Sequence, residues 1–418
     1  QVGGLAMHWG AVTPRFSPED FRQRSLYGVG TDWPITYEEL DPFYQEAEEL
    51  MGVAGEQGPE DLDPRGKPFP LPMIPLTYNL ELLKKWASNA GIAMWSQPSA
   101  KNSIPYRGRP QCCRNDTCSP ICPIGAKYSP DFTWSALRKA NRITLTTRTL
   151  VRKLVLSPDG KTVSHAVAVS SDRPDQPVEL RAKVFVVAAG YTWSSHLLLL
   201  SAQENAPNGV ANSSGLVGKY LAGHRNVQTT VELPLRLYPG MNEQHSLVTK
   251  QFMRLKAGSE YVRHDLRIWE SSNGRAPRLV DDKGALMLGD AILDDWRNRT
   301  KTGTARVRAY YDVIPDRASE LTLDPARKNA YGDPLPKLSF RDAPESVSIR
   351  ARTEDSIRTL FADMARAGNG RLLRTPTVDN FQDHPSGGCR MGSDASSSVV
   401  DSWGRAHDHE NLFVVGAP

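Results

Sequence analysis

The sequence predicts a mixed α/β fold, in which a Rossmann-like nucleotide-binding unit is joined to an antiparallel sheet. The stretch 184–190, VFVVAAG, is typical of a buried strand that ends at glycine, and the apolar stretch 194–201 follows it as a helix. A strand, turn and helix of this kind present the carboxyl edge of a sheet to a ligand. Between 226 and 340 the pattern changes to alternating strands, for example 307–314, separated by Pro and Gly turns.

The first part of the chain predicts helices separated by a loop. Apolar and aromatic residues in 37–51 fit an amphipathic helix that begins near Thr36, which we interpret as scaffold. The stretch 56–75 is rich in Pro, Gly and charge, so we expect a loop there. Helical spacing resumes over 80–90, and Gly91 is a plausible stop.

The middle and late parts of the chain predict strands between two helices. A helix is expected over 132–141, and a second over 344–367 with Gly368 as its stop. Four apolar residues of the second helix have core spacing, namely Ile357, Leu360, Phe361 and Met364. Asp159-Gly160 marks a hairpin turn. The predicted strands around it are 143–147, 150–156, 163–170 and 178–180.

The composition excludes several classes of function. Hydrophobic residues make up 39% of the 418 residues and the net charge is +4, so the chain is long and apolar enough for two or three globular domains. No basic patch with interleaved aromatic residues is present, which argues against nucleic acid as a partner. No apolar run approaches the roughly 20 residues of a membrane span, so any membrane association is expected only through a partner.

The cysteines are concentrated in one loop. Four of the five fall within 112–122, at the start of the loop 112–129, CCRNDTCSPICPIGAKYS. Cys112, Cys118 and Cys122 form a C-x5-C-x3-C-P run, and thiolates with such spacing typically hold an iron-sulfur cluster. Three usable ligands favour a three-iron cluster, although a four-iron cluster with an outside ligand is an alternative.

Zinc binding and disulfide bonds are the alternative roles for these cysteines. Zinc is a poorer match, because a closed site needs four Cys or His ligands and the nearest histidines, His8 and His196, are distant in the sequence. Cys112 is favoured over Cys113 as a cluster ligand, because adjacent residues rarely bind the same small cluster. Disulfide bonds in a secreted protein stay an alternative. Either Cys112 or Cys113 could pair with Cys118 or Cys122.

A second chemical segment lies near the end of the chain. The stretch 383–392, DHPSGGCRMG, sets His384 beside a flexible Gly-Gly turn. Imidazole titrates near neutral pH, so His384 could take a proton from a hydroxyl group. A lone histidine is also commonly structural, and the segment by itself does not decide between the two roles.

Taken together, these segments resemble the glucose-methanol-choline (GMC) oxidoreductases, and in particular the large subunits of bacterial FAD-dependent sugar dehydrogenases that carry an iron-sulfur cluster. HPSGGCRMG resembles the family's H-x-x-G-T-C-R-M-G segment, and GGLAMHWGA its first flavin-contacting segment. VVAAG with the leucine-rich helix resembles its second strand and helix beside FAD. The cysteine loop resembles the cluster loop of those dehydrogenases, and NLFVVGAP the strand before the last catalytic segment. The matches follow in order along nearly the whole chain.

The resemblance implies roles for single residues. His384 would be the base that removes the hydroxyl proton of the substrate while hydride passes to the flavin. Cys112, Cys118 and Cys122 would hold the cluster, expected to be 3Fe-4S. The residues expected to contact FAD are Gly3, Gly4, His8, Trp9, Gly10, Val151, Ala189, Gly190, Gly416 and Ala417.

The flavin segments also differ from the family in places. The M-H-W segment also resembles pyranose oxidases, in which the matching histidine is bonded covalently to the flavin. Retention of flavin by the denatured holoenzyme would indicate such a bond at His8. Leu5 and Ala6 stand where Ser or Thr is usual, and Gly388 replaces Thr.

The resemblance also implies how the chain is divided. We expect an FAD-binding domain over 1–225 that contains the cluster loop, a substrate domain with an antiparallel sheet over 226–375, and a return to the FAD-binding domain over 376–418. The family's G-x-G-x-x-G turn and its second catalytic His or Asn are expected beyond Gln1 and Pro418. Both ends therefore look cut inside a domain.

The function implied is an FAD-dependent dehydrogenase that oxidises a hydroxyl of a sugar, polyol or sugar acid and passes electrons through the cluster to an external acceptor. Its expected partners are a small chaperone-like subunit and a cytochrome c, in the periplasm. Rivals within the family are a glycoside 3-dehydrogenase and a pyranose-2-oxidase-like enzyme. Rivals from other classes are a non-catalytic iron-sulfur electron carrier, a carbohydrate-binding protein and a disulfide-stapled secreted module.

Overall fold

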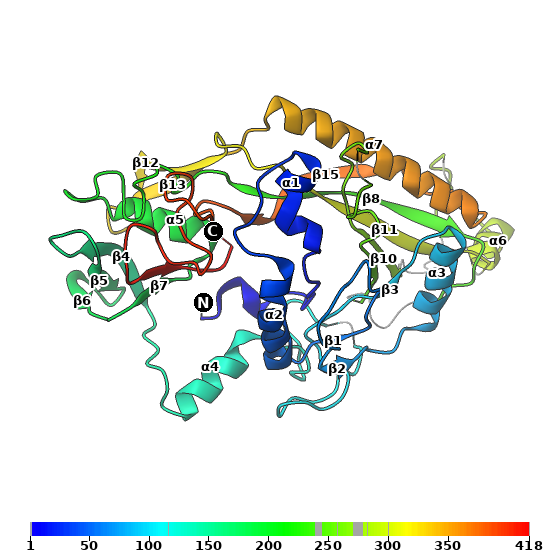
Figure 1. Cartoon of the computed structure of the whole chain (residues 1–418). Coiled ribbons are helices and arrows are strands. Elements are labelled where there is room, and N and C mark those ends of the chain that lie inside the picture. Colours follow the sequence, from blue (N-terminus) through cyan, green and yellow to red (C-terminus); the bar gives the residue numbers. More distant parts are fainter. Residues whose placement is uncertain are drawn as a thin grey trace.

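The largest feature of the computed structural model is an antiparallel sheet (Figure 1). The structure describes residues 2–115, 117–238, 245–256, 258–270, 279–281, 283–299 and 301–417. Within these residues the sheet has seven strands. Their order is β14 (Arg371–Leu372), β8 (Ala222–Leu233), β11 (Gly303–Asp312), β10 (Leu266–Glu270), β9 (Leu247–Thr249) and β3 (Trp95–Ser96), and β15 (Thr377–Ser386) also pairs with β8. The antiparallel sheet expected from 226–340 is confirmed, and strands from outside that range join it.

The two faces of this sheet differ in polarity. Side chains alternate across a strand, and one set, including Val227 and Val307, is fully buried against α3 (Tyr78–Asn89) and α7 (Pro344–Ala367). Phe361 of α7 is completely buried in this core, and burial of such a side chain contributes roughly 1.5–3 kcal/mol. The other face of β8, β10 and β11 carries polar and charged side chains, which leaves it suited to binding rather than to packing.

A smaller α/β unit lies at one end of the molecule (Figure 1). Its β7 (Phe185–Val187) pairs in parallel with β16 (Leu412–Val414), and α5 (Gly190–Leu200) follows β7. A three-stranded antiparallel sheet and a separate hairpin pack around α5. They consist of β4 (Thr149–Leu156), β5 (Val163–Ser170) and β6 (Arg173–Leu180), and of β12 (Glu320–Lys328) and β13 (Pro334–Ser339).

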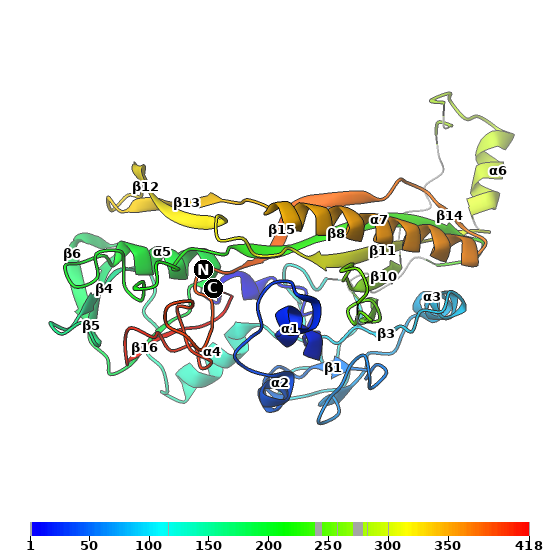
Figure 2. The ribbon, with the colours of Figure 1, turned by 45° about the horizontal axis from the view of Figure 1, so that its top comes forward.

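The N-terminal part of the chain lies between the large sheet and this unit. Figure 2 shows the two ends of the chain close together there, and α6 projecting from the far end of the large sheet. The remaining elements are η1 (Gly4–Met7), η2 (Pro18–Arg22), α1 (Gln23–Tyr27), α2 (Tyr37–Met51), β1 (Ala54–Gly55), β2 (Leu71–Pro72), α4 (Pro130–Lys139) and α6 (Asp290–Arg299). No described helix has the length and apolar character needed to span a membrane.

Elements with clear end signals have the predicted limits. The helix expected over 37–51 is α2, and it begins after Thr36 because a capping box forms there: Glu39 N donates to Thr36 Oγ1 at 3.2 Å, and Thr36 N donates to Glu39 Oε2 at 2.7 Å. The helix expected over 344–367 is α7, which ends before Gly368.

Three expectations about the elements are wrong. The stretch 143–147 is not a strand; it connects α4 to β4 with mostly exposed side chains. The strand within 184–190 is short and half-exposed, with Val184 52% and Val186 58% accessible, because the described chain covers only one face of its two-stranded sheet. The helix α6 lies in the region where we expected only strands. The domain boundaries themselves stay predictions.

Candidate active site

The carboxyl ends of β7 and β16 bring together four of the residues expected to contact the cofactor. Ala189 and Gly190 follow β7, Gly416 and Ala417 follow β16, and all four are exposed. Gly190 has a φ of 81° and opens α5, and a Cβ added there would meet open space. The result is a bare edge of small residues at a helix N-terminus, which is where α/β sheets bind nucleotide-like ligands.

The Gly-Gly turn after His384 is attached to this edge. Gly387 N donates to Ala417 O at 2.9 Å. Both glycines have a positive φ, 92° for Gly387 and 104° for Gly388. A Cβ on Gly387 would overlap the carbonyl of Tyr220, and one on Gly388 would overlap Ser195 Oγ. In this chain, therefore, the turn requires glycine at both positions.

His384 lies on β15 and faces a second histidine. Its φ of 47° is uncommon for a residue with a side chain. Its Nδ1 lies 2.6 Å from Nε2 of His224, which is on β8. The ring of His224 in turn packs edge-on against Tyr310 of β11, with 4.6 Å between ring centroids. The structure therefore places an imidazole pair on the polar face of the large sheet.

The direction of the hydrogen bond in this pair determines its chemistry. When Nδ1–H of His384 donates to Nε2 of His224, Nε2 of His384 keeps its lone pair and can accept a proton. The residue His384 as a whole is exposed. His224 then orients the base, in the way that a third group orients the base in catalytic triads.

No sequence motif singles out His224. Its partner lies 160 positions away, so no local pattern connects the two histidines. Alternation alone places His224, Asn226 and Gln228 on one face of β8. Asn226 is buried, and neither atom of its amide has a hydrogen-bond partner among the described residues, which marks this face as unusual for a structural core.

The N-terminal flavin-like segment is fixed to the cysteine loop. Gly3 has a φ of 87° and precedes the single turn of η1, while His8 is exposed. Trp9 Nε1 donates to Tyr128 O at 2.9 Å, and Lys127 Nζ donates to Trp9 O at 2.8 Å. These contacts hold the segment that contains Gly4 and Gly10 beside the loop.

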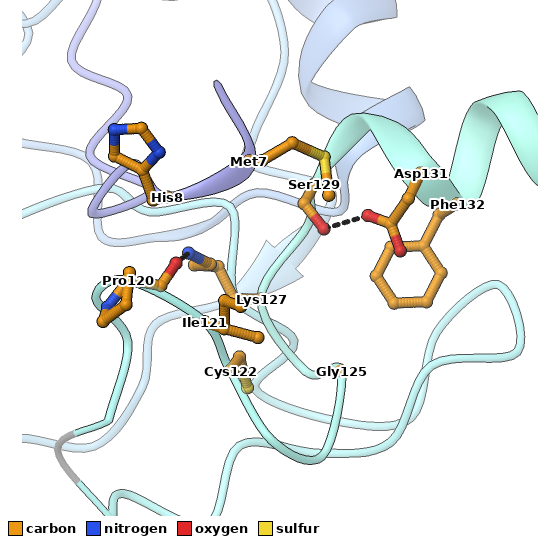
Figure 3. A pocket seen from close by; sticks show the side chains of 10 residues that line it. All are labelled: Met7, His8, Pro120, Ile121, Cys122, Gly125, Lys127, Ser129, Asp131 and Phe132. Carbon is orange, nitrogen blue, oxygen red and sulfur yellow. Dashed lines mark hydrogen bonds between the residues drawn. The ribbon is translucent and has the colours of Figure 1, made fainter. Parts of the chain in front are cut away.

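A cavity of about 330 Å³ separates the same two segments (Figure 3). His8 and Met7 line one side, and Cys122 and Gly125 line the other. Lys127 lies between them and also donates to Pro120 O at 3.3 Å. One of the expected cluster ligands and one of the expected flavin contacts therefore face the same space.

The three expected cluster ligands differ in burial. Cys118 is buried, Cys112 and Cys122 are half-buried, and Cys113 is exposed; all are free thiols. Burial raises the pKa of the Cys112 thiol, and the charges of Cys118 and Cys122 add to this effect. Among the described residues, no group of three or more Cys, His, Asp or Glu side chains could hold a metal ion. The cluster therefore stays a prediction.

Cys122 is surrounded by backbone N–H groups. Burial opposes ionisation of its thiol, but backbone hydrogen bonds at Lys127, Ile124, Ala126 and Gly125 outweigh burial and lower the pKa. The thiolate is the form of cysteine that binds metals.

Positive charges are buried around the same loop. Lys101 and Lys127 are 1% and 2% exposed and face each other across a β-bridge, and Arg109 is 4% exposed and donates to Ala126 O at 3.0 Å. Burial lowers the pKa of Lys127, whereas the thiols of Cys118 and Cys122 counteract that change. An anionic group beside these side chains would be stabilised.

Val151 lies neither at the carboxyl edge of β7 and β16 nor in the lining of the cavity beside the cysteine loop. It lies in β4, opposite Ala168 of β5, and packs against the core of the smaller unit. The structure shows a packing role for Val151, and its expected contact with the adenine stays a prediction.

Comparison with known proteins gives a consistent set of relatives. Family models described as GMC oxidoreductase match residues 104–226 and 315–417. The fructose dehydrogenase large subunit of Gluconobacter japonicus is 34% identical over 99% of this chain and 74% of that protein. The gluconate 2-dehydrogenase flavoprotein of Pantoea cypripedii is 26% identical over 100% of this chain and 74% of that protein.

Solved structures support the fold. A formate oxidase structure matches with a TM-score of 0.60 and 13% identity, over 98% of this chain and 78% of that one. An FAD-dependent oxidoreductase from Chaetomium thermophilum matches with a TM-score of 0.57 and 12% identity, over 97% of this chain and 79% of that one. At this level of identity the two structures show that the fold is shared, and they carry no information about the substrate of this chain.

Proposed function

The chain belongs to the GMC oxidoreductase family, and from this premise we propose that it is an FAD-dependent dehydrogenase for a sugar, polyol or sugar acid. The relatives include dehydrogenases named for fructose and for gluconate. In this proposal electrons leave through an iron-sulfur cluster to an external acceptor.

The observation that carries this proposal is the imidazole pair beside the carboxyl edge. His384 and His224 are 2.6 Å apart, and the turn after His384 is hydrogen-bonded to Ala417 at that edge. A base for a hydroxyl proton therefore lies next to the surface where a nucleotide cofactor fits. An electron carrier or a carbohydrate-binding protein would not require this arrangement.

The residues at the edge fit FAD. Ala189, Gly190, Gly416 and Ala417 are small and exposed, so a planar ring or a pyrophosphate could approach the backbone closely. They would hold the cofactor together with the segment from Gly3 to Gly10. FAD, when bound, would accept the hydride from the carbinol carbon.

The chain's own side chains would handle the proton. In the tautomer in which His384 Nδ1–H donates to His224 Nε2, His384 Nε2 would accept the proton of the substrate hydroxyl. Because His224 is packed against Tyr310, the acceptor is held in place and the base keeps its tautomer and orientation.

The loop chemistry supports the cluster part of the proposal. Cys112, Cys118 and Cys122 would be the ligands, with the depressed pKa of Cys122 favouring the thiolate form. In a three-iron cluster each cysteine would bind a different iron ion. The cysteine sulfurs would therefore not need to be as close together as in a site with a single metal ion. The buried Lys101 and Lys127 would offset the negative charge of a thiolate-bound cluster.

The partners and the location are proposed by analogy. One relative is named a large subunit, which indicates an assembly for that protein. We propose that this chain likewise works with a small chaperone-like subunit and a cytochrome c acceptor, in the periplasm, and that any membrane association is through those partners.

Anaerobic spectroscopy of the full-length holoenzyme tests the function. Adding sugars, polyols and sugar acids one at a time is expected to bleach the flavin absorption with at least one of them, and re-aeration is expected to yield little hydrogen peroxide. Rapid peroxide formation would instead favour an oxidase, as one relative, the 6'''-hydroxyparomomycin C oxidase of Streptomyces lividus, is named. The position of the oxidised carbon in the product distinguishes the proposed enzyme from a glycoside 3-dehydrogenase. No bleaching with any alcohol would contradict the proposed function.

Replacing His224 with leucine tests its positioning role. Loss of the acceptor for His384 Nδ1–H is expected to lower kcat by about 10–100-fold, part of the 10²–10⁴-fold effect of a general base. KM is expected to change little, because His224 is not placed against the substrate. Steady-state kinetics with an artificial electron acceptor measures both.

Two further variants distinguish positioning from folding. His224→Gln restores an acceptor on β8 and is expected to recover part of kcat. His165→Leu removes a half-buried histidine of β5, which contacts Glu179 at 3.5 Å and Ser164 Oγ at 3.2 Å, and is expected to leave kcat unchanged. Equal kcat for His224→Leu and the wild type would rule out the positioning role.

A further inference from the structure

Two arginines stand opposite each other on the polar face of the large sheet. Arg267 of β10 and Arg308 of β11 are direct cross-strand partners. Like charges in this position destabilise a sheet, so the arrangement needs a compensating interaction. Arg267 has one, since its Nε donates to Asp265 at 2.8 Å.

Arg308 has only neutral partners within the described chain. Its Nε donates to Gln228 Oε1 at 3.1 Å, its Nη2 donates to the same oxygen at 2.6 Å, and its Nη1 donates to Tyr310 Oη at 2.8 Å. These bonds use three of the five N–H groups of a guanidinium. The side chain is therefore held in place, with its full charge and two donors left over.

The aromatic residues around Arg308 add to its fixation. Its guanidinium lies 5.6 Å from the ring centroid of Trp269 and 5.5 Å from that of Tyr310, and Arg267 lies 4.6 Å from the ring of Tyr310. Cation–π contacts stabilise such cations but do not neutralise them. The guanidinium of Arg308 therefore keeps its positive charge beside Tyr310.

This charge lies next to the imidazole pair. The ring of Tyr310 contacts the ring of His224, and its hydroxyl accepts a hydrogen bond from Arg308 Nη1. Along β8, His224 and Gln228 are four residues apart, about 13 Å at the usual rise of a strand, and their side chains share a face. Arg308 spans part of this separation, because its side chain reaches Tyr310.

We propose that Arg308, assisted by Arg267, is an anion subsite that binds the carboxylate of a sugar acid while a hydroxyl of the same molecule lies at His384. A guanidinium binds a carboxylate well, because its remaining N–H donors match the carboxylate oxygens in geometry and charge. This inference rests on the proposed function, and it selects sugar acids from the sugars and polyols included there.

Replacing Arg308 with glutamine in the full-length holoenzyme tests the subsite. With D-gluconate as substrate, kcat/KM is expected to fall about 10–100-fold, as for loss of a charge-assisted hydrogen bond. With D-glucose, the uncharged counterpart, it is expected to stay within about twofold. Added salt is expected to weaken the use of gluconate and not that of glucose, because screening acts on charge. Arg366→Gln, which changes an arginine of α7 whose side chain is 76% exposed, is the control.

The outcomes separate this inference from the proposed function. Equal losses for gluconate and glucose, or no loss for either, would overturn the anion subsite. Binding gives a readout without turnover, because Trp269 lies beside Arg308 and its fluorescence should respond to gluconate. A gluconate titration that saturates in the wild type but not in Arg308→Gln supports the subsite even if no alcohol reduces the flavin, whereas identical titrations contradict it.

Discussion

Replacing His384 with alanine is expected to lower kcat by about 10²–10⁴-fold, the range for loss of a general base. The substrate hydroxyl would then lose the base proposed for it, and His224 would not replace that base, since it is packed against Tyr310. Substrate binding should be largely kept. The measurement is the rate of flavin bleaching after anaerobic mixing with a substrate of the wild type.

Chemical rescue distinguishes a missing base from a misfolded site. His384 is exposed and Gly387 holds the turn through its bond to Ala417, so the space left by the alanine should admit free imidazole. Added imidazole is expected to restore part of the bleaching rate. An unchanged rate in His384→Ala would remove His384 from the mechanism and return it to a structural role.

Replacing Cys122 with serine is expected to abolish iron binding and the electron paramagnetic resonance signal of an oxidised three-iron cluster in the anaerobically purified, full-length enzyme. The backbone N–H groups around Cys122 lower the pKa of its thiol, and a serine hydroxyl there would stay protonated and bind iron poorly. Flavin bleaching by substrate should continue. Transfer of electrons to a protein acceptor should stop.

Cys113→Ser is the matched control for this change. Cys113 is exposed and next to the half-buried Cys112, so its replacement should leave the iron content unchanged. If Cys113→Ser loses iron and Cys112→Ser keeps it, Cys113 rather than Cys112 is the cluster ligand. A wild-type enzyme without iron, with these cysteines oxidised to disulfides, would rule out the cluster.

The parts of the fold that the sequence predicts well have local physical causes. The capping box at Thr36 acts within α2, and the apolar spacing of Ile357 and Phe361 acts within α7. Both helices have the predicted limits. The half-exposed state of Val184 and Val186 could not be predicted in this way, because burial depends on what the rest of the chain places over a strand.

The candidate site divides in the same way. The glycines of the carboxyl edge and the cysteine run are short segments with their own chemistry, so single stretches indicate them. The pairing of His224 with His384 depends on the register of β8 with β15, and the pairing of Arg308 with Gln228 depends on the register of β8 with β11. Such register is set by tertiary packing, and no short pattern encodes it.

Lys127 links the segment expected to contact flavin with the cysteine loop. Its ammonium group donates to Trp9 O in the flavin-like segment and to Pro120 O in the cysteine loop. A ligand that orders one of these two segments reduces the conformational entropy that the other segment loses when its own ligand binds. Each binding event would therefore strengthen the other by the same factor. Assembly of the holoenzyme would then be cooperative, with iron retaining flavin and flavin retaining iron.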